Sequence, residues 1–405
     1  MDLVERQYET FPYPARDPAE EADRLIEGSP SHPVEIDHFL FGGQRDWTQP
    51  FKALVAGGGT GDGLIMLAQR LADIGCPAEI TYLDRSEAAR AIAEARAKAR
   101  GLTIDFRTGD LLEAASLGRF DYIDCCGVLH HLADPDAGFA ALANAMAEGG
   151  GMGLMVYAPH GRTGVYPLQR AFGQLFADDP PKDQVALARH ALGALPATNW
   201  FQRNDFVGDH KDGDAGLYDL LLHARDRPYR VEELAASLNR AGLAIVSMVE
   251  PARYDPVRYL PPGEPYARKL AAMDRVARWQ VAEDLAGNIK THVAYVAAKD
   301  RADTAEARPT QAQSVPHLRG ATAQALSRHV ANHGQVRVTL DGLEFLIPLG
   351  QDSARLIAAI NGRRPLGITA EAMGLDWMTF QARWAPIHRG LAGFNLLHYS
   401  RGARR

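Results

Sequence analysis

The sequence predicts an α/β protein built on a doubly wound, mostly parallel sheet. Between residue 51 and about residue 160, short apolar runs alternate with amphipathic stretches of helical period, which is the pattern of repeated strand–helix units. The first apolar run ends in a turn with four glycines between residues 57 and 61. With 405 residues, 46% of them hydrophobic and 23% charged, the chain has the composition of a globular protein of about two or three domains.

The first strand is predicted over 53–56, and the helix after the turn places Leu64, Leu67 and Leu71 on one face. Glycine suits the turn because it adopts positive φ and lets a ligand approach the backbone closely. The free N–H groups at the helix start would face that ligand. The glycine spacing differs from the Gly-x-Gly-x-x-Gly of dinucleotide-binding proteins, which argues against a nicotinamide-dependent dehydrogenase.

The next elements continue the strand–helix order. A strand over 79–83 ends at Asp84, and a carboxylate at this position can accept hydrogen bonds from two ribose hydroxyls. Ser86 is placed to cap an alanine-rich helix that ends at Gly101. The later strands are expected over 102–106, 120–126 and 153–157, with a helix from Asp134-Pro135 to Gly149–Gly151 before the last of them.

Four motifs, taken in order, resemble those of class I S-adenosylmethionine-dependent methyltransferases. They are Gly57-x-Gly59-x-Gly61, Asp84 at the end of the second strand, Gly109-Asp110-Leu111, and Gly127-Val-Leu-His-His-Leu132. The resemblance covers roughly residues 50–160 and implies a Rossmann-like fold, a seven-stranded sheet and S-adenosyl-L-methionine as the cofactor. Val55 departs from the first motif of the family, which usually has an acid there to organise the methionine end of the cofactor.

The resemblance also implies roles for individual residues. Asp84 would bind the ribose, Asp110 would accept a hydrogen bond from the adenine amino group, and Leu111 would cover the adenine ring. The cofactor-binding residues expected in this domain are Gly57, Gly58, Gly59, Gly61, Asp62, Asp84, Arg85, Asp110, Leu111 and Cys126.

Residues 1–46 precede the first strand, and their stretch from Tyr8 to Pro18 is too rich in proline to be helical after Thr10. In related enzymes such a segment often folds over the cofactor as a lid, in which Tyr8, Tyr13, Phe11 and Arg16 would close the site, with Tyr8 and Arg16 at the cofactor. The alternative is an arm packed on the edge of the sheet, with Phe11 and Tyr13 as its anchors.

An insertion over 158–230 follows the fifth strand, where the family places the acceptor side of the cleft. Methyl transfer from a sulfonium mainly requires alignment of the reactants and exclusion of water, and an acceptor that carries a proton also requires a base. His131 and His130 are the candidates for that base, and a structural role in shaping the cleft is the alternative. The residues expected to bind the acceptor are Tyr157, His160, Arg162 and Tyr166.

The doubly wound domain is expected to span 47–300, followed by a linker over 301–316 and a small C-terminal α+β domain over 317–405. Asp341-Gly342 between two apolar runs predicts a β-hairpin, and this hairpin with three short helices loosely resembles a winged-helix module. The remaining elements are expected as helices over 231–239, 264–285, 354–360, 369–373 and 376–391, and as strands over 243–249, 291–298 (antiparallel) and 395–399.

Charge is distributed unevenly along the chain. The net charge is −6, yet the segment from Leu318 to the end has eleven arginines against five acids. One hypothesis is an enzyme whose appended domain recruits the acceptor or a second copy of the chain. The other is a cofactor-sensing regulator that binds nucleic acid through its basic domain. The helix over 376–391 presents only Arg383 and Arg389 among large apolar side chains, which favours protein contact over nucleic acid.

The acceptor itself is not identified by any motif. The long insertion and the extra domain favour a protein, a peptide or a bulky metabolite over a very small molecule. No apolar run approaches the ~18 residues of a membrane span, and the first residues lack the apolar core of a signal peptide, so a cytoplasmic protein without membrane contact is expected. Cys76 and the adjacent pair Cys125 and Cys126 predict neither a disulfide framework nor a metal site.

Overall fold

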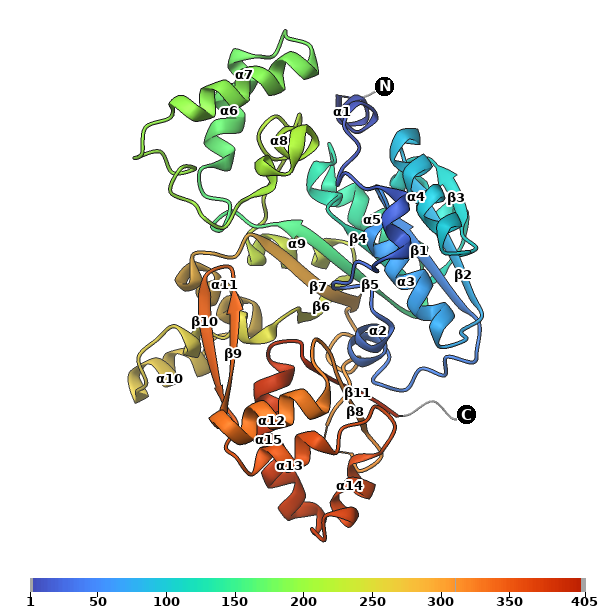
Figure 1. The fold of residues 1–405 in the computed structure, drawn as a ribbon, viewed down its shortest axis with the longest axis vertical. Helices are drawn as coiled ribbons and strands as arrows, with labels where there is room; N and C mark the ends of the chain where they lie inside the picture. Colours follow the sequence, from blue (N-terminus) through green and yellow to red (C-terminus); the bar gives the residue numbers. More distant parts are fainter. Residues whose placement is uncertain (1–2, 310, 402–405) are drawn as a thin grey trace.

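A computed structural model describes residues 3–309 and 311–401 of the chain. At its centre lies a seven-stranded sheet with the order β3-β2-β1-β4-β5-β7-β6 (Figure 1). Strands β1 to β5 are parallel, and β7 is antiparallel to both of its neighbours, which confirms the doubly wound fold and its antiparallel closure. The strands are β1 Phe51–Ala56, β2 Ala78–Asp84, β3 Asp105–Thr108, β4 Phe120–Cys126, β5 Met146–Tyr157, β6 Leu243–Met248 and β7 Thr291–Ala298.

Helices cover both faces of the sheet because its strands are apolar on both sides. In β1, Ala53 and Val55 belong to one apolar cluster, whereas Leu54 and Ala56 belong to the cluster on the opposite face. The first face is covered by α2 (Pro33–Leu40), α3 (Asp62–Asp73) and α4 (Glu87–Ala99). The opposite face is covered by α5 (Pro135–Ala145), α9 (Val231–Arg240) and α11 (Arg275–Ala286).

Several boundaries differ from the predicted ones. Strand β3 begins at Asp105, because the N–H of Leu102 still donates to Ala97 O at the end of α4. The helix-rich stretch predicted over 264–285 consists of two helices, α10 (Glu264–Ala271) and α11, and Asp274 caps the second of these.

The glycines predicted to end α5 lie inside strand β5 instead, since α5 already ends at Ala145. Gly151, and Gly153 further along the strand, make room for side chains that pack on β5. A Cβ at Gly151 would lie 2.7 Å from the side chain of Leu40, and one at Gly153 would lie 2.2 Å from the Tyr122 hydroxyl. The prediction was wrong because glycine was interpreted as a helix end where it permits close packing.

The segment before β1 contains α1 (Leu3–Thr10), a short 3₁₀ helix η1 (Pro18–Ala22) and α2. Helix α1 ends at Thr10 as predicted, but α2 was not predicted. It begins at Pro33 with His32 as its N-cap, and seven of its eight residues are buried.

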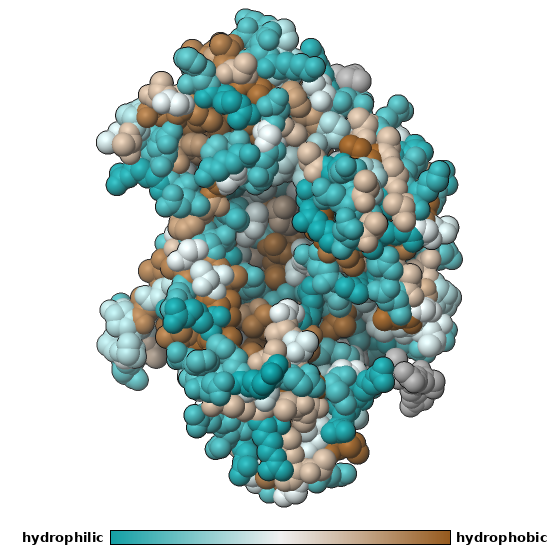
Figure 2. Space-filling view, viewed as in Figure 1, coloured by the Kyte–Doolittle hydropathy of each residue, from teal (hydrophilic) through white to brown (hydrophobic). Residues whose placement is uncertain are grey.

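The insertion after β5 forms a helical unit above the carboxyl ends of the strands, at the top of Figure 1. It contains α6 (Val165–Leu175), α7 (Pro181–Ala194) and α8 (Gly213–Leu221), which share an apolar cluster of their own. Figure 2 shows that the molecule is hollowed between this unit and the C-terminal part, and that apolar residues gather in the hollow.

The C-terminal part packs against the sheet domain through α2. The predicted linker over 301–316 packs on the sheet domain at its start, because Ala302 and Ala305 are buried against the first face of the sheet. The Asp341-Gly342 turn has positive φ at both residues and joins β9 to β10, which confirms the hairpin. The winged-helix likeness stays a prediction. The elements are β8 Val315–Leu318, α12 Ala323–His333, β9 Gln335–Leu340, β10 Leu343–Pro348, α13 Ser353–Ala358, α14 Leu366–Ala372, α15 Trp377–Ala392 and β11 Leu397–Ser400.

Within residues 3–309 and 311–401, no helix combines the length and the apolar character that crossing a membrane would require.

Candidate cofactor and acceptor site

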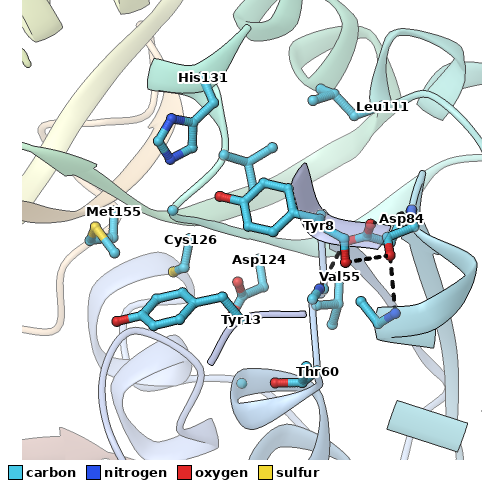
Figure 3. Close-up of a pocket in the computed structure, with 18 of the residues that line it drawn as sticks. Tyr8, Tyr13, Val55, Thr60, Asp84, Leu111, Asp124, Cys126, His131 and Met155 are labelled. Carbon is cyan, nitrogen blue, oxygen red and sulfur yellow. Dashed lines mark hydrogen bonds between the residues drawn. The ribbon is translucent and has the colours of Figure 1, made fainter. Parts of the chain in front are cut away.

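A cavity of about 600 Å³ opens at the carboxyl ends of β1 to β4. Strands β1 and β4 are neighbours whose connections leave the sheet in opposite directions, and doubly wound sheets bind ligands at such a switch point. Figure 3 shows Asp84 and Leu111 on one side of the cavity, Met155 and Cys126 on the other, and Tyr8 and Tyr13 across its opening. The lining includes the predicted residues Tyr8, Gly57, Gly58, Gly59, Gly61, Asp62, Asp84, Arg85, Asp110, Leu111, Cys126, His131 and Tyr157.

The glycine turn is shaped so that a side chain at its first positions would not fit. Gly57, Gly59 and Gly61 have positive φ. A Cβ at Gly57 would lie 2.3 Å from Val128, and one at Gly58 would lie 2.4 Å from the Tyr82 ring. The backbone of the turn therefore forms the wall of the cavity directly.

Asp84 holds this turn in place. One carboxylate oxygen accepts the N–H of Gly59 at 2.8 Å, and the other accepts the N–H of Ser86 at 2.9 Å. Burial raises the pKa of Asp84, while these backbone hydrogen bonds oppose the shift. Each carboxylate oxygen keeps a second lone pair, so Asp84 can still accept hydrogen bonds from a ligand.

Asp110 and Leu111 lie at the start of the 3₁₀ helix η2 (Leu111–Leu117), which follows β3. One oxygen of Asp110 caps this helix by accepting the N–H of Leu112 at 2.9 Å, and the other lies 3.9 Å from Arg85. Arg85 also reaches Glu5 of α1 at 3.2 Å. The N-terminal helix is thereby tied to the Asp84 side of the cavity.

Asp62 and Arg16 form an ion pair with each other. The Asp62 carboxylate accepts from Arg16 at 2.6 Å and from the buried Arg96 at 2.7 Å. Burial opposes ionisation of Asp62, but these two guanidinium groups bring its pKa below the ordinary value. Arg16 does not line the cavity. Its ion pair with Asp62 connects the N-terminal segment to α3, and we call this ion pair the clasp.

The opposite side of the cavity holds a polar cluster that joins three parts of the chain. The Tyr8 hydroxyl donates to one oxygen of Asp219 at 3.0 Å, and the Tyr157 hydroxyl donates to the other at 3.2 Å. The Tyr8 oxygen also lies 3.2 Å from Nε2 of His223. Burial raises the pKa of Asp219 and lowers that of His223. The cluster connects α1, β5 and α8.

Hydrogen bonds to the backbone fix the protons of two stacked histidines, His131 and His223, whose ring centres lie 3.8 Å apart. Nδ1 of His131 lies 2.8 Å from the carbonyl oxygen of Arg225, and because a carbonyl can only accept, this nitrogen carries the proton. In the neutral ring, Nε2 of His131 therefore keeps a free lone pair.

His223 has the opposite arrangement. Its Nδ1 accepts the N–H of Arg225 at 3.0 Å, so its Nε2 carries the proton and donates to Tyr8. The ligand atoms of His131, Asp219 and His223 lie within 4.8 Å of one another. However, both nitrogens of His223 are engaged in hydrogen bonds, so the group forms a hydrogen-bond network rather than a set of open metal ligands.

The other predicted residues are placed differently. His130 is fully buried between His131 and Tyr157, outside the cavity, and burial keeps its pKa well below the ordinary value. Arg162 and Tyr166 lie behind Tyr157: the guanidinium carbon is 3.6 Å from the centre of the Tyr157 ring, and Nε donates to the Tyr166 hydroxyl at 3.1 Å. His160 lies apart and contacts Asp284 at 3.0 Å.

The site residues predicted from the sequence did not include Tyr13, Asp124, Asp219, His223 and Arg225, although Tyr13 was considered as part of a lid and Asp124 as a residue that could face the cleft. Tyr13 was weighed as an anchor of a packed arm, and Asp219 follows a polar stretch that is typical of a solvated loop. Their burial comes from the docking of α1 and α8, which no local pattern indicates. Asp124 lies on β4, whose other residues are apolar except Asp121, and an acid on such a strand was the signal available.

Comparisons with known proteins agree with this geometry. Residues 54–152 match a protein family described as a methyltransferase domain. The chain is 31% identical over 239 residues to an uncharacterized protein of a Synechococcus species, covering 57% of this chain and 56% of that protein. It therefore spans little more than half the length of this curated relative.

Two solved structures show the same fold. PKMT2 from Rickettsia typhi in complex with AdoHcy superposes with a TM-score of 0.61 at 14% identity, over 91% of this chain and 75% of that one. A second structure of PKMT2 from Rickettsia typhi gives 0.57 at 13% identity, over 99% and 77% of the two chains. Residues 54–152 thus match a methyltransferase domain, and the sheet that contains them has the Rossmann-like fold seen in these two structures.

Proposed function

We propose that this protein is a methyltransferase that uses S-adenosyl-L-methionine. The observation that carries the proposal is the cavity at the switch point of the sheet, walled by a bare glycine turn that Asp84 holds in place. Its volume of about 600 Å³ falls within the range of ligand-binding pockets. The match of residues 54–152 to a methyltransferase domain supports the proposal.

The lining fits an adenosyl group with an amino-acid tail. Asp84 has free lone pairs for ribose hydroxyls, and Asp110 has an oxygen left for an adenine amino group beside the apolar Leu111. S-adenosylmethionine supplies an electrophilic methyl group whose leaving group is a neutral thioether. The protein's task is then to align the acceptor and to exclude water.

His131 is the residue that we assign as the base. It lines the cavity with its Nδ1 proton held by the Arg225 carbonyl, which leaves Nε2 free to take a proton from the acceptor. Tyr157 and Asp219 line the same side and offer polar groups for orienting the acceptor. Tyr8, on α1, closes this side against water because its hydroxyl is bonded to Asp219.

The acceptor that this arrangement suits is a nucleophile carrying a removable proton, presented by a protein, a peptide or a bulky metabolite. The helical unit α6–α8 beside the site supports a large acceptor, as does the hollow between that unit and the C-terminal part (Figure 2). We infer that the C-terminal part contributes contacts to such an acceptor or to a second copy of the chain, and that the protein works in the cytoplasm.

The test uses purified protein in two steps. Calorimetry with AdoHcy, the demethylated product of the cofactor, should show binding at one site per chain. Extract from the source cells, treated with the protein and methyl-labelled S-adenosylmethionine, should then show label in the macromolecular fraction or in large metabolites. Absence of AdoHcy binding would contradict the proposed function, and label confined to very small molecules would contradict the proposed acceptor class.

A further inference from the structure

Asp124 is a buried carboxylate that faces the cavity from the middle of the sheet. It lies on β4 and pairs in register with Val55 of β1, and both residues line the cavity (Figure 3). Its side chain reaches the first turn of α3, where a Cβ at Gly63 would lie 3.1 Å from Oδ2. The residue is 4% exposed, so the protein holds this carboxylate at the floor of the cavity.

The other acids at the centre and sides of the cavity have partners of their own. Asp62 pairs with Arg16 and Arg96. Asp84 accepts backbone N–H groups, Asp110 faces Arg85, and Asp219 accepts two tyrosine hydroxyls, as described above.

Asp124 differs from all of these. Its partner is the thiol of Cys126, and no lysine, arginine or histidine forms an ion pair with it among residues 3–309 and 311–401. A buried carboxylate without a cation is costly. Asp124 is therefore positioned to bind a cationic group of a ligand, because the protein itself supplies no cation at this point of the cavity.

We propose that Asp124 binds the α-ammonium group at the methionine end of the cofactor. This inference rests on the proposed function and goes beyond it, because it fixes which end of the ligand lies on the Val55–Asp124 strand pair. The negative charge missing from β1 at Val55 is supplied from the neighbouring position on β4. With Asp84 at the opposite side of the cavity, the ligand extends from β2 across β1 to β4.

The cofactor carries two cationic groups, the ammonium and the sulfonium. Binding of three different ligands distinguishes the contribution of each group. S-adenosylmethionine has both groups, AdoHcy has only the ammonium, and 5′-methylthioadenosine has neither. Calorimetry of the wild type and Asp124→Asn should show an affinity for AdoHcy about tenfold or more lower in the variant. Affinity for 5′-methylthioadenosine should stay within about twofold, because that ligand has no amino-acid group.

A second variant transfers the carboxylate from position 124 on β4 to position 55 on β1. Val55→Asp combined with Asp124→Val should recover part of the lost AdoHcy affinity if the cavity needs a carboxylate at this level of the sheet. Circular dichroism and thermal melting of each variant establish that it is folded, and the double variant keeps the test valid if Asp124→Asn does not fold.

The possible outcomes distinguish the two proposals. Failure of the wild type to bind AdoHcy would overturn both the proposed function and the role of Asp124. Binding by the wild type with unchanged affinity in Asp124→Asn would overturn the role of Asp124 alone. So would an equal loss for AdoHcy and 5′-methylthioadenosine, or a loss confined to S-adenosylmethionine, which would assign Asp124 to the sulfonium.

Discussion

Asp84 and Asp124 are two buried carboxylates in one cavity, and their different partners give them different tasks. Asp84 is already hydrogen-bonded to Gly59 and Ser86 before a ligand arrives, whereas Asp124 has only a thiol. The first organises the backbone and contacts neutral hydroxyls. The second has no cationic partner, which makes its ionisation sensitive to the charge of the ligand.

For Asp84→Ala, we predict an affinity for AdoHcy about tenfold or more below that of the wild type. The ribose would lose its acceptor and the Gly59 N–H would lose its partner. Because 5′-methylthioadenosine also carries the ribose, its affinity should fall by a similar factor, in contrast to the result for Asp124→Asn. Calorimetry with both ligands checks this, and an unchanged affinity would show that the ribose lies elsewhere.

Asp124 should also make the ligand-free protein depend on pH. Burial raises the pKa of its carboxyl from 3.8 to about 7. Between these two pH values the folded state retains a proton that the unfolded chain releases, so the free energy of unfolding falls as the pH rises. The groups that face it, Tyr122 and Cys126 on β4 and Tyr295 on β7, stay uncharged there because burial raises their pKa values.

Asp124→Asn removes this titration. Compared with the wild type, the variant should be equally stable near pH 4 and more stable above pH 7, by about 4 kcal/mol at most. Denaturant unfolding at several pH values measures the difference. A constant difference across the range would contradict the assignment. Saturating AdoHcy should reduce or reverse the difference in the free energy of unfolding between the variant and the wild type, because the ammonium group of AdoHcy compensates the wild-type carboxylate.

For His131→Asn, we predict a kcat about a hundredfold lower, which is a typical contribution of a general base. AdoHcy affinity should stay within about twofold of the wild type, because the ring binds the acceptor's proton rather than the cofactor. The matched control is His190→Asn on the exposed side of α7, which should leave kcat unchanged. A lower affinity with an unchanged kcat would assign His131 a structural role instead.

At the scale of elements, the N-terminal segment is held over the cavity by side-chain bonds at both ends. Tyr8 and Glu5 attach α1 to Asp219 and Arg85, and Arg16 attaches the following stretch to Asp62. We propose that this segment acts as a lid, and its opening would require these bonds to break.

Arg16→Ala should loosen the lid. Amide hydrogen exchange in residues 3–30 should become faster, and limited proteolysis should cut this segment sooner, because Asp62 retains only Arg96. Arg24→Ala is the control, since Arg24 forms an exposed pair with Glu20 in the same segment and exposed pairs contribute less than about 1 kcal/mol. Equal exchange rates in both variants would contradict the clasp.

The same elements show how far the sequence could predict the structure. Strands β1, β2, β4 and β7 and the helix caps at Ser86 and Asp134 follow local patterns, and the cofactor side of the site depends on turns directly after those strands. Their prediction needed no knowledge of distant contacts.

The acceptor side could not be predicted in the same way. Asp219 and His223 enter the cavity because α8 packs beside α1, and no sequence period encodes that packing. Helix α2 was missed for a related reason: it buries Glu35, Asp37 and His38, so its sequence lacks an apolar stripe. Glu35 and His38 are satisfied by partners far along the chain, which tertiary structure alone provides.

At the scale of the whole molecule, Glu35 of α2 connects three regions of the chain. It is fully buried and forms an ion pair with Arg319 in the C-terminal part. It also accepts hydrogen bonds from Tyr295 of β7 at 2.7 Å and from Asn395 at 2.8 Å. The sheet, the N-terminal segment and the C-terminal part therefore meet at one carboxylate.

Arg319→Met should lower the free energy of unfolding by about 3–5 kcal/mol, because it leaves the Glu35 charge buried without its cation. Arg337→Met is the matched control: it breaks the exposed pair with Glu344 and should cost less than about 1 kcal/mol. Chemical denaturation measures both. Similar losses in the two variants would mean that the Glu35 pair contributes no more than a surface pair.

The position of Glu35 has a practical consequence for anyone who wishes to work with a shorter protein. A chain truncated after β7 would keep every strand of the large sheet, yet it would lack Arg319 and Asn395. Glu35 would then be exposed to solvent or left without counter-charge, and the side of α2 that packs on β11 would lose its cover. A protein truncated after β7 should therefore aggregate rather than act as a minimal enzyme. The sheet domain and the C-terminal part should be produced together.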